Sequence, residues 1–291
     1  MIVRKAHLFL GWAFLILMKA TLYIYKLFNY LSFDVACGAM VCATFFAHIL
    51  HVQLLPYGQA SLGLTVWIIY TIDHLLDVRK LKREASTKRH RFHQKNFWAL
   101  LTFLIIAMLI DLSLILLIRK PILIWGIGLA LVVVLYLYFQ QRLILFKELV
   151  VSLLYSSGIL LPAMSLTRMV LSVDEIILIS FFTLTAFINL ILFSWYDWKQ
   201  DIRDNHPSLV TFFGRKEVKK FLVILFLLQT AFSVDLILVS SYRIEALILV
   251  MMNLPLLILF LFPEKFMRGD LYRLIGDAVF LLPLPYLLAN G

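Results

Sequence analysis

The sequence has 291 residues, of which 63% are hydrophobic and 15% charged, with a formal net charge of +10 and a mean hydropathy of +0.94. Soluble domains are about 45–50% apolar, so this composition excludes an ordinary soluble protein. Repeated apolar runs of about 20 residues match the thickness of a bilayer, and we interpret the chain as an all-α, polytopic membrane protein. The basic excess falls in a few loops beside apolar runs, a pattern that favours membrane orientation over nucleic-acid binding.

The first 31 residues form a basic, amphipathic segment whose structure the sequence leaves open. Lys19 and Lys26 interrupt the apolar residues of 6–31. A helix lying in the membrane interface therefore competes with an additional span. We favour the interfacial helix, and treat 1–31 as separate from a single transmembrane domain at 32–291.

Nine apolar runs follow, and we expect each to form a transmembrane helix. The breaks fall at Pro, Gly and charged clusters such as Pro56-Tyr57-Gly58. The last run is the weakest, because it contains Asp277 and two prolines. The expected spans are 33–55, 57–77, 97–118, 121–140, 147–170, 175–196, 219–240, 243–262 and 270–289.

The distribution of basic residues orients these spans. With nine spans and the N-terminus inside, all but four of the 27 Lys and Arg fall on the inner side. Such asymmetry marks the cytoplasmic side of a membrane protein, and we expect the cytoplasmic membrane of a bacterium. The four exceptions are Arg119, Lys120, Arg168 and Arg243.

Two pairs of aspartates end apolar helices just before clusters of basic residues. Asp73 and Asp77 precede one basic loop, and Asp197 and Asp201 precede another, 124 residues later in each case. Four expected spans separate the pairs, and an even number of spans returns the chain to the same membrane face. The sequence therefore predicts one composite site at the cytoplasmic ends of the helices.

The spacing of these carboxylates favours a bound divalent cation. Like charges at i, i+4 repel each other on a helix, and carboxylates at a helix C-terminus oppose the helix dipole. A cation between them removes both penalties, and Mg²⁺ is usually bound by carboxylates together with substrate phosphates. The alternative explanation is that these are solvated charges flanking membrane helices, which two matched pairs on one face make less favourable.

These motifs resemble those of the UbiA superfamily of intramembrane prenyltransferases, over about residues 30–290. The segment "YDWKQDIRDNHPSLVTFFGRK" is similar to the family's second Asp-rich motif, and "QQRLILFKELVVSLLYSSGILLP" to its basic loop before the fifth helix. In the first motif, N-D-x2-D-x3-D, Asp73 and Asp77 match the last two carboxylates. Ile69 and Tyr70 stand where the family has Asn and the first Asp.

The resemblance implies a nine-helix bundle that binds an isoprenyl diphosphate through Mg²⁺ and transfers the isoprenyl group to a lipophilic acceptor, such as an aromatic quinone precursor. It implies catalytic, metal-binding roles for Asp73, Asp77, Asp197 and Asp201, with Asp204 as a further metal ligand. The diphosphate-binding residues that it implies are Arg89, Arg91, Arg142, Lys147 and Lys199. Tyr70 and Tyr196 lie beside the motifs and are candidates for lining the substrate or the carbocation.

Two other classes of protein compete with this interpretation. CDP-alcohol phosphotransferases also place aspartates at a membrane face, but their D-G-x2-A-R and G-x3-D-x3-D pattern is missing here. A transporter-like or non-catalytic protein that handles ions or lipids on the same fold is the main alternative, and the departure at Ile69 keeps it open. Transporters tend to place coupling sites near the bilayer midplane, whereas these aspartates lie at helix ends.

Overall fold

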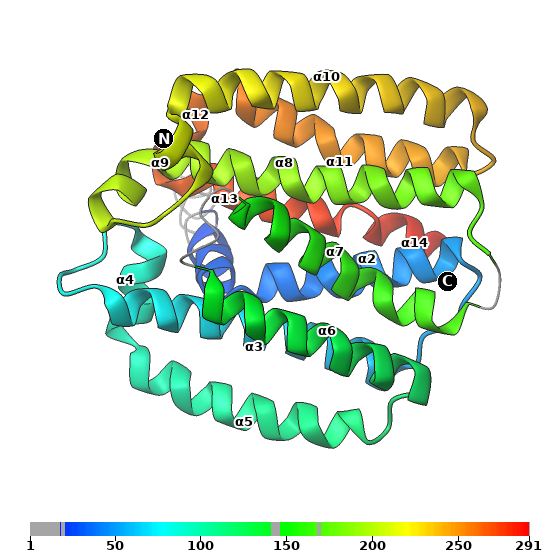
Figure 1. Cartoon of the computed structure of the whole chain (residues 1–291), viewed down its shortest axis with the longest axis horizontal. Coiled ribbons are helices and arrows are strands. Elements are labelled where there is room, and N and C mark those ends of the chain that lie inside the picture. The colour runs from blue at the N-terminus through cyan, green and yellow to red at the C-terminus, as the bar shows by residue number, and fades with distance from the viewer. Residues whose placement is uncertain (1–17, 19–20, 141–145, 168–169, 291) are drawn as a thin grey trace, which may run out of the picture.

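The fold is a bundle of long helices, seen in a computed structural model that describes residues 18, 21–140, 146–167 and 170–290 (Figure 1). The described residues contain helices and connecting turns and no strand. The long helices are α2 (Phe33–Ile49), α3 (Pro56–Lys80), α5 (Phe97–Ile115), α6 (Lys120–Phe139), α7 (Lys147–Leu166), α8 (Val173–Asp204), α10 (Arg215–Val239) and α11 (Arg243–Leu261). The shorter ones are α4 (Lys88–Lys95), α9 (Leu209–Phe213), α12 (Pro263–Phe266), η1 (Arg268–Asp270), α13 (Leu271–Ala278), η2 (Val279–Leu281) and α14 (Leu284–Asn290).

Eight segments of the described chain are long and apolar enough to cross a membrane, including the broken C-terminal run at Arg268–Asn290. A ninth span is present only if residues 21–30 and α2 count as one bent span, since α2 alone has 17 residues. The expected all-α polytopic bundle is confirmed. The expected count of nine spans holds only with the bent pair.

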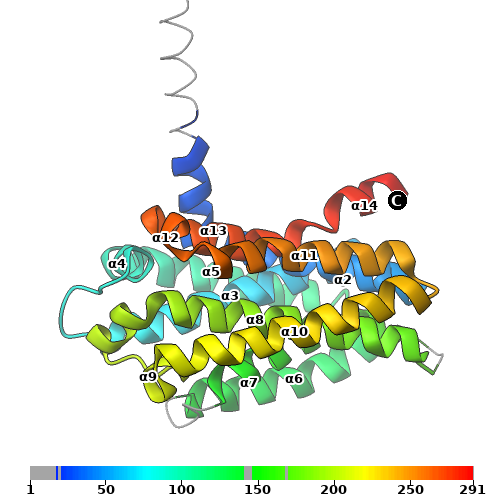
Figure 2. The same ribbon diagram turned by 90° about the horizontal axis from the view of Figure 1, so that it is seen from above.

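The helix at residues 21–30 meets α2 at an angle of 78° and projects from the bundle beside α13 (Figure 2). The Tyr25 hydroxyl donates to the carbonyl of Leu274 across this contact at 3.1 Å. Most of the predicted interfacial segment lies outside the described residues, so its interfacial placement stays a prediction.

Helix α8 organises the core and carries the second aspartate pair. Ser172 and Glu175 form a capping box at its start, and Asn205 ends it in the left-handed conformation. Its 32 residues span about 48 Å at the rise of an α-helix, well beyond a hydrocarbon core of about 30 Å. Because of this extra length, Asp197 and Asp201 lie on the last turns of a continuous helix rather than after its end.

The outer helices expose apolar side chains, and the one carboxylate buried in this region is paired across helices. On α5 and α6 most large apolar residues are exposed, as expected for surfaces in contact with lipid. Asp111 of α5 is buried, and its two oxygens accept hydrogen bonds from Ser61 Oγ at 2.6 Å and Thr65 Oγ1 at 2.8 Å, both on α3. Asp111 therefore joins α5 to α3.

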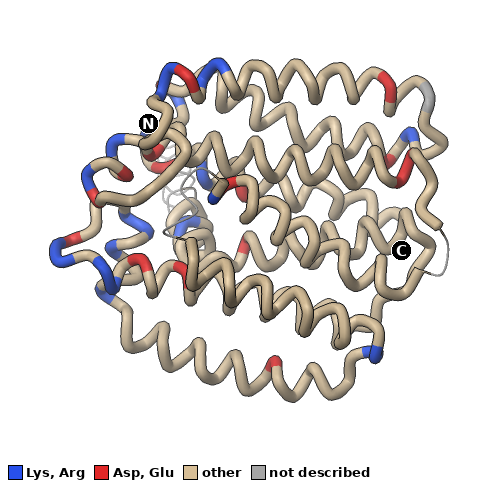
Figure 3. The backbone as a smooth tube through the Cα atoms, viewed as in Figure 1, with Lys and Arg blue, Asp and Glu red and all other residues tan. Residues whose placement is uncertain are grey.

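Charged residues gather at one end of the bundle (Figure 3), around α4, α9 and the loops beside them. Both aspartate pairs lie at this end. The parity argument from the sequence, which placed the two pairs on one face, is confirmed by this arrangement. The side of the membrane that this end faces stays a prediction.

The C-terminal run is broken, and one glycine lets it approach the core closely. Pro283 lies between η2 and α14, and Pro285 is the second residue of α14, so neither has a backbone N–H with which to continue a helix from η2. A Cβ atom on Gly276 of α13 would lie 2.5 Å from Phe193 and 2.6 Å from Asn189 Oδ1 of α8. Glycine is therefore what allows α13 to rest against α8 beside the second aspartate pair.

Candidate active site

A cavity of about 650 Å³ lies at the charged end of the bundle, and both aspartate pairs line it. Its volume is within the range of small-molecule sites, about 300–1,000 Å³. Apolar and aromatic side chains, among them Val35, Tyr155, Phe193 and Phe280, line it together with polar ones. The charged residues on the wall are Asp73, Asp77, Lys80, Lys82, Arg83, Arg89, Lys147, Glu148, Asp197, Asp201, Asp204, Arg273 and Asp277.

The first pair, on α3, has carboxylate oxygens free to bind a ligand. Asp73 Oδ1 is buried without a hydrogen-bond partner among the described residues. Asp77 lies one turn later, with Lys80 Nζ 3.7 Å from its Oδ1 and His206 Nε2 3.8 Å from its Oδ2. Such long contacts leave the pair weakly neutralised.

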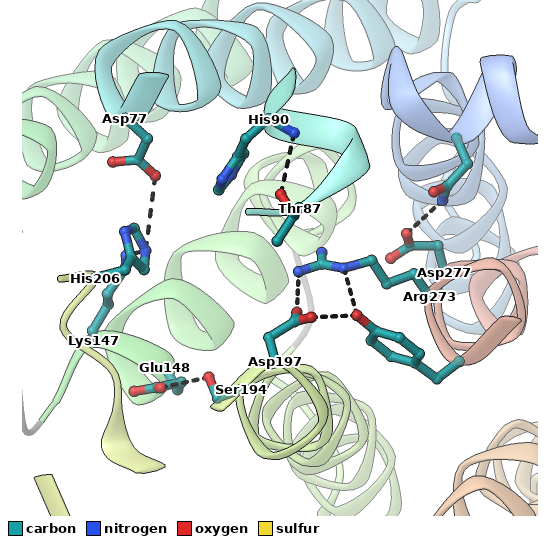
Figure 4. A network of polar contacts seen from close by, with 12 residues as sticks. Asp77, Thr87, His90, Lys147, Glu148, Ser194, Asp197, His206, Arg273 and Asp277 are labelled. Atoms are coloured by element: carbon teal, nitrogen blue, oxygen red, sulfur yellow. Dashed lines mark hydrogen bonds and ion pairs between the residues drawn. The ribbon is translucent and has the colours of Figure 1, made fainter. Parts of the chain in front are cut away.

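Lys147 and His206 stand across from Asp77 of this pair (Figure 4). Lys147 Nζ is 2.9 Å from His206 Nε2, so the ammonium donates and the imidazole accepts. Burial, and then the charge of Lys147, lower the pKa of His206 to about 4. His206 is therefore neutral near pH 7, and its contact with Asp77 is not an ion pair. Of Lys147 and His206, which both line the cavity, Lys147 is therefore the one that carries a positive charge.

The second pair, on α8, has a different environment. Asp197 is 3% exposed, and both of its oxygens are engaged by α13: Tyr272 donates its hydroxyl to Oδ1, and Arg273 donates Nη2 to Oδ2 (Figure 4). The Tyr272 ring in turn stacks on Tyr196 with centroids 4.3 Å apart. Asp197 is thus neutralised and fixed in place by partners from a helix about 75 residues away in sequence.

The remaining acidic candidates, Asp201 and Asp204, both line the cavity, and Asp204 also anchors a loop. Asp204 accepts hydrogen bonds from the backbone N–H of Ser86 at 2.9 Å and from its hydroxyl at 2.7 Å, with Arg83 3.9 Å away. Asp204 therefore holds the loop between α3 and α4 against the end of α8.

Of the basic residues implied for diphosphate binding, Lys147 and Arg89 line the cavity. Arg91 and Lys199 do not, and the Lys199 ammonium lies 5.7 Å from the ring of its neighbour Trp198. Arg142 falls outside the described residues. Of the four that the structure describes, it thus brings two to the cavity of the aspartate pairs.

Arg89 is buried within a polar network on the far wall of the cavity. Its Nη2 donates to Ser32 Oγ at 2.5 Å. Close by, the side-chain amide of Asn29 donates to both Asp34 and Asp277, the latter at 2.8 Å. The buried guanidinium is therefore surrounded by groups that balance its charge.

Helix α4 places His93 inside the bundle and His90 on the cavity wall. His93 is 1% exposed, its Nδ1 is 3.0 Å from the carbonyl oxygen of Arg89, and its ring lies 4.8 Å from that of His74. Burial lowers the pKa of His93 to about 4. Both nitrogens of His74, which lines the cavity, lack a hydrogen-bond partner among the described residues.

The two tyrosines singled out beside the motifs have different positions. Tyr70 lines the cavity. Tyr196 is buried outside the cavity wall, and its hydroxyl donates to the carbonyl of Leu259 at 2.6 Å. Ile69 is also outside the wall, so nothing at that position replaces the polar group that the family motif has there.

The residues present fit a Mg²⁺ ion at the first pair better than at the second. No ready-made cluster of three His, Cys, Asp or Glu is present among the described residues, so a metal here would need oxygens from its substrate, as is usual for Mg²⁺. Asp73 has such an unengaged oxygen among the described residues, and the nitrogen atoms beside the Asp77 oxygens lie 3.7 and 3.8 Å away. Asp197 has no such oxygen, because Tyr272 and Arg273 use both of its oxygens.

Several polar residues of the cavity were not found by sequence reasoning. Arg273 was counted only as a basic residue on the inner side, and Asp277 only as a weakness in the last span. Glu148 accepts from Ser194 Oγ at 2.8 Å and from the N–H of Leu209 at 2.9 Å, joining α7 to α8 and α9. These residues could have been identified from the rule that ionisable residues within membrane helices tend to face the bundle interior and to have a function.

The structure is thus an all-α bundle of membrane-spanning helices in which two acidic pairs and several cations meet in one cavity at the helix ends. Among proteins of known sequence, no protein-family model matches this chain. No curated protein matches it.

Solved structures do match. A UbiA homolog from Archaeoglobus fulgidus bound to GPP and Mg²⁺ has a TM-score of 0.67, with 14% identity over 90% of this chain and 98% of that chain. The structure of a UbiA homolog from the same organism bound to DMAPP and Mg²⁺ gives a TM-score of 0.60, with 12% identity and the same coverage. The apo UbiA homolog from Aeropyrum pernix K1 gives 0.63, with 11% identity over 88% of this chain and 98% of that chain. The chain has the UbiA fold.

Proposed function

We propose that this chain is a divergent member of the UbiA superfamily that transfers an isoprenyl group from an isoprenyl diphosphate to a lipophilic acceptor within the membrane. The observation that carries the proposal is the meeting of Asp73, Asp77, Asp197 and Asp201 on the wall of one cavity beside Lys147. The structural neighbours bound to DMAPP or GPP and Mg²⁺ support a prenyl diphosphate as the class of donor.

The polar end of the cavity receives the diphosphate. Asp73 and Asp77 would hold Mg²⁺, which when bound neutralises diphosphate oxygens and so favours their departure. Lys147 donates hydrogen bonds to the remaining phosphate oxygens, because its ammonium faces the cavity from the opposite helix. Fixed charges aimed at the leaving group stabilise the negative charge that builds on it as the C–O bond breaks.

The apolar end of the cavity receives the isoprenyl chain. The rings of Tyr70, Tyr155, Phe193 and Phe280 line this part, and aromatic faces attract a cation placed over them. They would protect the allylic carbocation from water until the acceptor attacks it. Lipid on the outer helices supplies the environment from which such an acceptor enters.

The test is pyrophosphate release by purified protein reconstituted in lipid, with Mg²⁺, prenyl diphosphates of several chain lengths and a membrane-lipid extract as the source of acceptor. We expect Mg²⁺-dependent release by the wild type and a loss of about 100-fold or more in Asp77→Asn. Asp235→Asn is the matched control, because Asp235 is exposed on α10 and does not line the cavity. Equal rates in wild type and Asp77→Asn, or no release with any donor, would favour the transporter-like alternative.

A further inference from the structure

We propose that the guanidinium of Arg273 occupies the position of a second metal ion, so that this chain binds its diphosphate with one Mg²⁺ and one arginine. This inference rests on the proposed function. It concerns which cation each of the two aspartate pairs, which share the spacing D-x3-D, holds against the diphosphate.

The first step is the occupancy of Asp197. Its Oδ1 accepts from Tyr272 and its Oδ2 from Arg273, and the carboxylate is 3% exposed. A metal ion bound there would displace the guanidinium. Arg273 would then stay in a half-buried position 5.3 Å from the ring of Phe193, with its carboxylate partner taken. Leaving a buried charge without its partner is costly, so the pair resists replacement by a metal.

The second step is the charge balance. A Mg²⁺ ion between two carboxylates is neutral overall, and so is the ion pair between Asp197 and Arg273. The guanidinium therefore compensates the charge of Asp197 on this side of the cavity, while Asp201, the other member of the pair, lines the cavity with its own carboxylate. The first pair has no comparable partner: Asp73 Oδ1 is buried and unpartnered among the described residues, and the ammonium of Lys80 is 3.7 Å from Asp77.

The third step is the unused donor capacity of Arg273. A guanidinium has five N–H donors in a planar fork that matches phosphate oxygens. Among the described residues, its hydrogen bonds use Nε, 3.4 Å from the Tyr272 hydroxyl, and Nη2, on Asp197. The side chain lines the cavity, so Nη1 and the second Nη2 proton are free to donate to a diphosphate. Asp197 and Tyr272 act as positioning residues for this fork.

The position of Arg273 is also built into the backbone. Gly276, one turn farther along α13, permits the close packing on Phe193 and Asn189 of α8. Tyr272 is fixed by its stacking on Tyr196. A guanidinium held this firmly is preorganised for a phosphate, in the way that fixed donors are most effective.

The experiment counts metal ions rather than turnover. Mn²⁺ bound per chain is measured by electron paramagnetic resonance, with geranyl S-thiolodiphosphate present as a donor analogue that resists ionisation. We expect one Mn²⁺ in the wild type and in Asp197→Asn, and none in Asp77→Asn. In Arg273→Met we expect a second Mn²⁺ at high concentration and, at limiting Mn²⁺, analogue binding weakened by about 10- to 100-fold.

Controls separate this inference from folding effects and from the proposed function. Arg268→Met removes an exposed arginine nearby that does not line the cavity, and should leave both readouts unchanged. Arg273→Met/Asp197→Asn avoids a buried unpaired carboxylate, and should show the weakened analogue binding if Arg273→Met alone fails to fold. Two Mn²⁺ in the wild type with one lost in Asp197→Asn, or wild-type behaviour of Arg273→Met, would overturn the inference while leaving prenyl transfer intact. Absence of analogue binding by the wild type would overturn the proposed function itself.

Discussion

The two aspartate pairs have the same spacing and line the same cavity, yet their surroundings differ. On α3, Asp73 has an unpartnered oxygen, and Asp77 has only long contacts with nitrogen atoms of Lys80 and His206. On α8, Asp197 is saturated by Tyr272 and Arg273. A short motif thus defines which side chains face a site, whereas tertiary partners determine what those side chains are free to bind.

The largest expected effect comes from replacing one aspartate in each pair. Asp73→Asn removes a free metal-binding oxygen and should lower Mg²⁺-dependent pyrophosphate release by about 100-fold or more. Asp197→Asn keeps the shape: its amide oxygen can accept from Arg273 and its NH2 group can donate to the Tyr272 hydroxyl. We therefore expect a loss of about 10-fold or less, with an unchanged Mg²⁺ requirement. Titrating Mg²⁺ against the initial rate checks both. A shift of the Mg²⁺ requirement in Asp197→Asn to match that of Asp73→Asn would show that the pairs are equivalent.

A second change tests the partners of the α8 pair. Tyr272→Phe leaves one oxygen of a buried carboxylate without its donor, and we expect it to lower the free energy of unfolding by about 1–3 kcal/mol. Thermal unfolding in detergent or lipid measures this. Tyr57→Phe is the control, because Tyr57 is 52% exposed on α3 and should have no measurable effect. Equal stability of the two variants would contradict the role of Tyr272.

A third change tests the packing that brings α13 to the α8 pair. Gly276→Ala introduces a Cβ atom 2.5 Å from Phe193, and overpacking of this kind costs about 1–3 kcal/mol. Activity should fall together with stability, since the displaced α13 carries Arg273. Gly58→Ala on α3 is the control: its Cβ meets nothing within 4 Å, so it should be neutral or slightly stabilising. A neutral Gly276→Ala would show that α13 has room to move.

The smallest expected effect depends on pH and falls on the α3 side, where His93 packs on His74. Because burial lowers the pKa of His93 to about 4, the unfolded chain binds the proton first. Stability from this group is present above the unfolded pKa of about 6.5 and is lost as pH falls toward 4. We expect a loss of about 1 kcal/mol between about pH 7 and pH 5.5.

Hydrogen exchange of α4 compared with α13 measures where this loss occurs. Protection of α4 should decrease first in acid, whereas α13, whose contact with α8 contains no histidine among the described side-chain contacts, should change less. His93→Gln removes the titrating group and should flatten this part of the pH profile. An unchanged profile in His93→Gln would assign the pH dependence to other groups.

The four aspartates of the site could be predicted from the sequence, because the features that mark them are local in the chain. Apolar length, loop charge and the parity of spans placed Asp73, Asp77, Asp197 and Asp201 at one end of a bundle, and the cavity contains all four. Arg273 could not be singled out, because a basic residue at the edge of a weak apolar run has the same local pattern as the other basic residues in loops. The metal-binding role of Asp204 stays a prediction: the residue lines the cavity, and its carboxylate accepts hydrogen bonds from Ser86.

The sequence by itself determined the class of protein: a 63% hydrophobic chain must bury its backbone polar groups in helices to cross a membrane, and paired carboxylates at helix ends favour a cation beside them. Tertiary structure alone decided that Asp197 is paired with Arg273. The contact between Asp197 and Arg273 joins residues 76 positions apart, and no periodicity or local spacing encodes a contact of that range. It exists because a glycine lets α13 approach α8, which places a guanidinium beside a carboxylate that burial would otherwise leave unpaired.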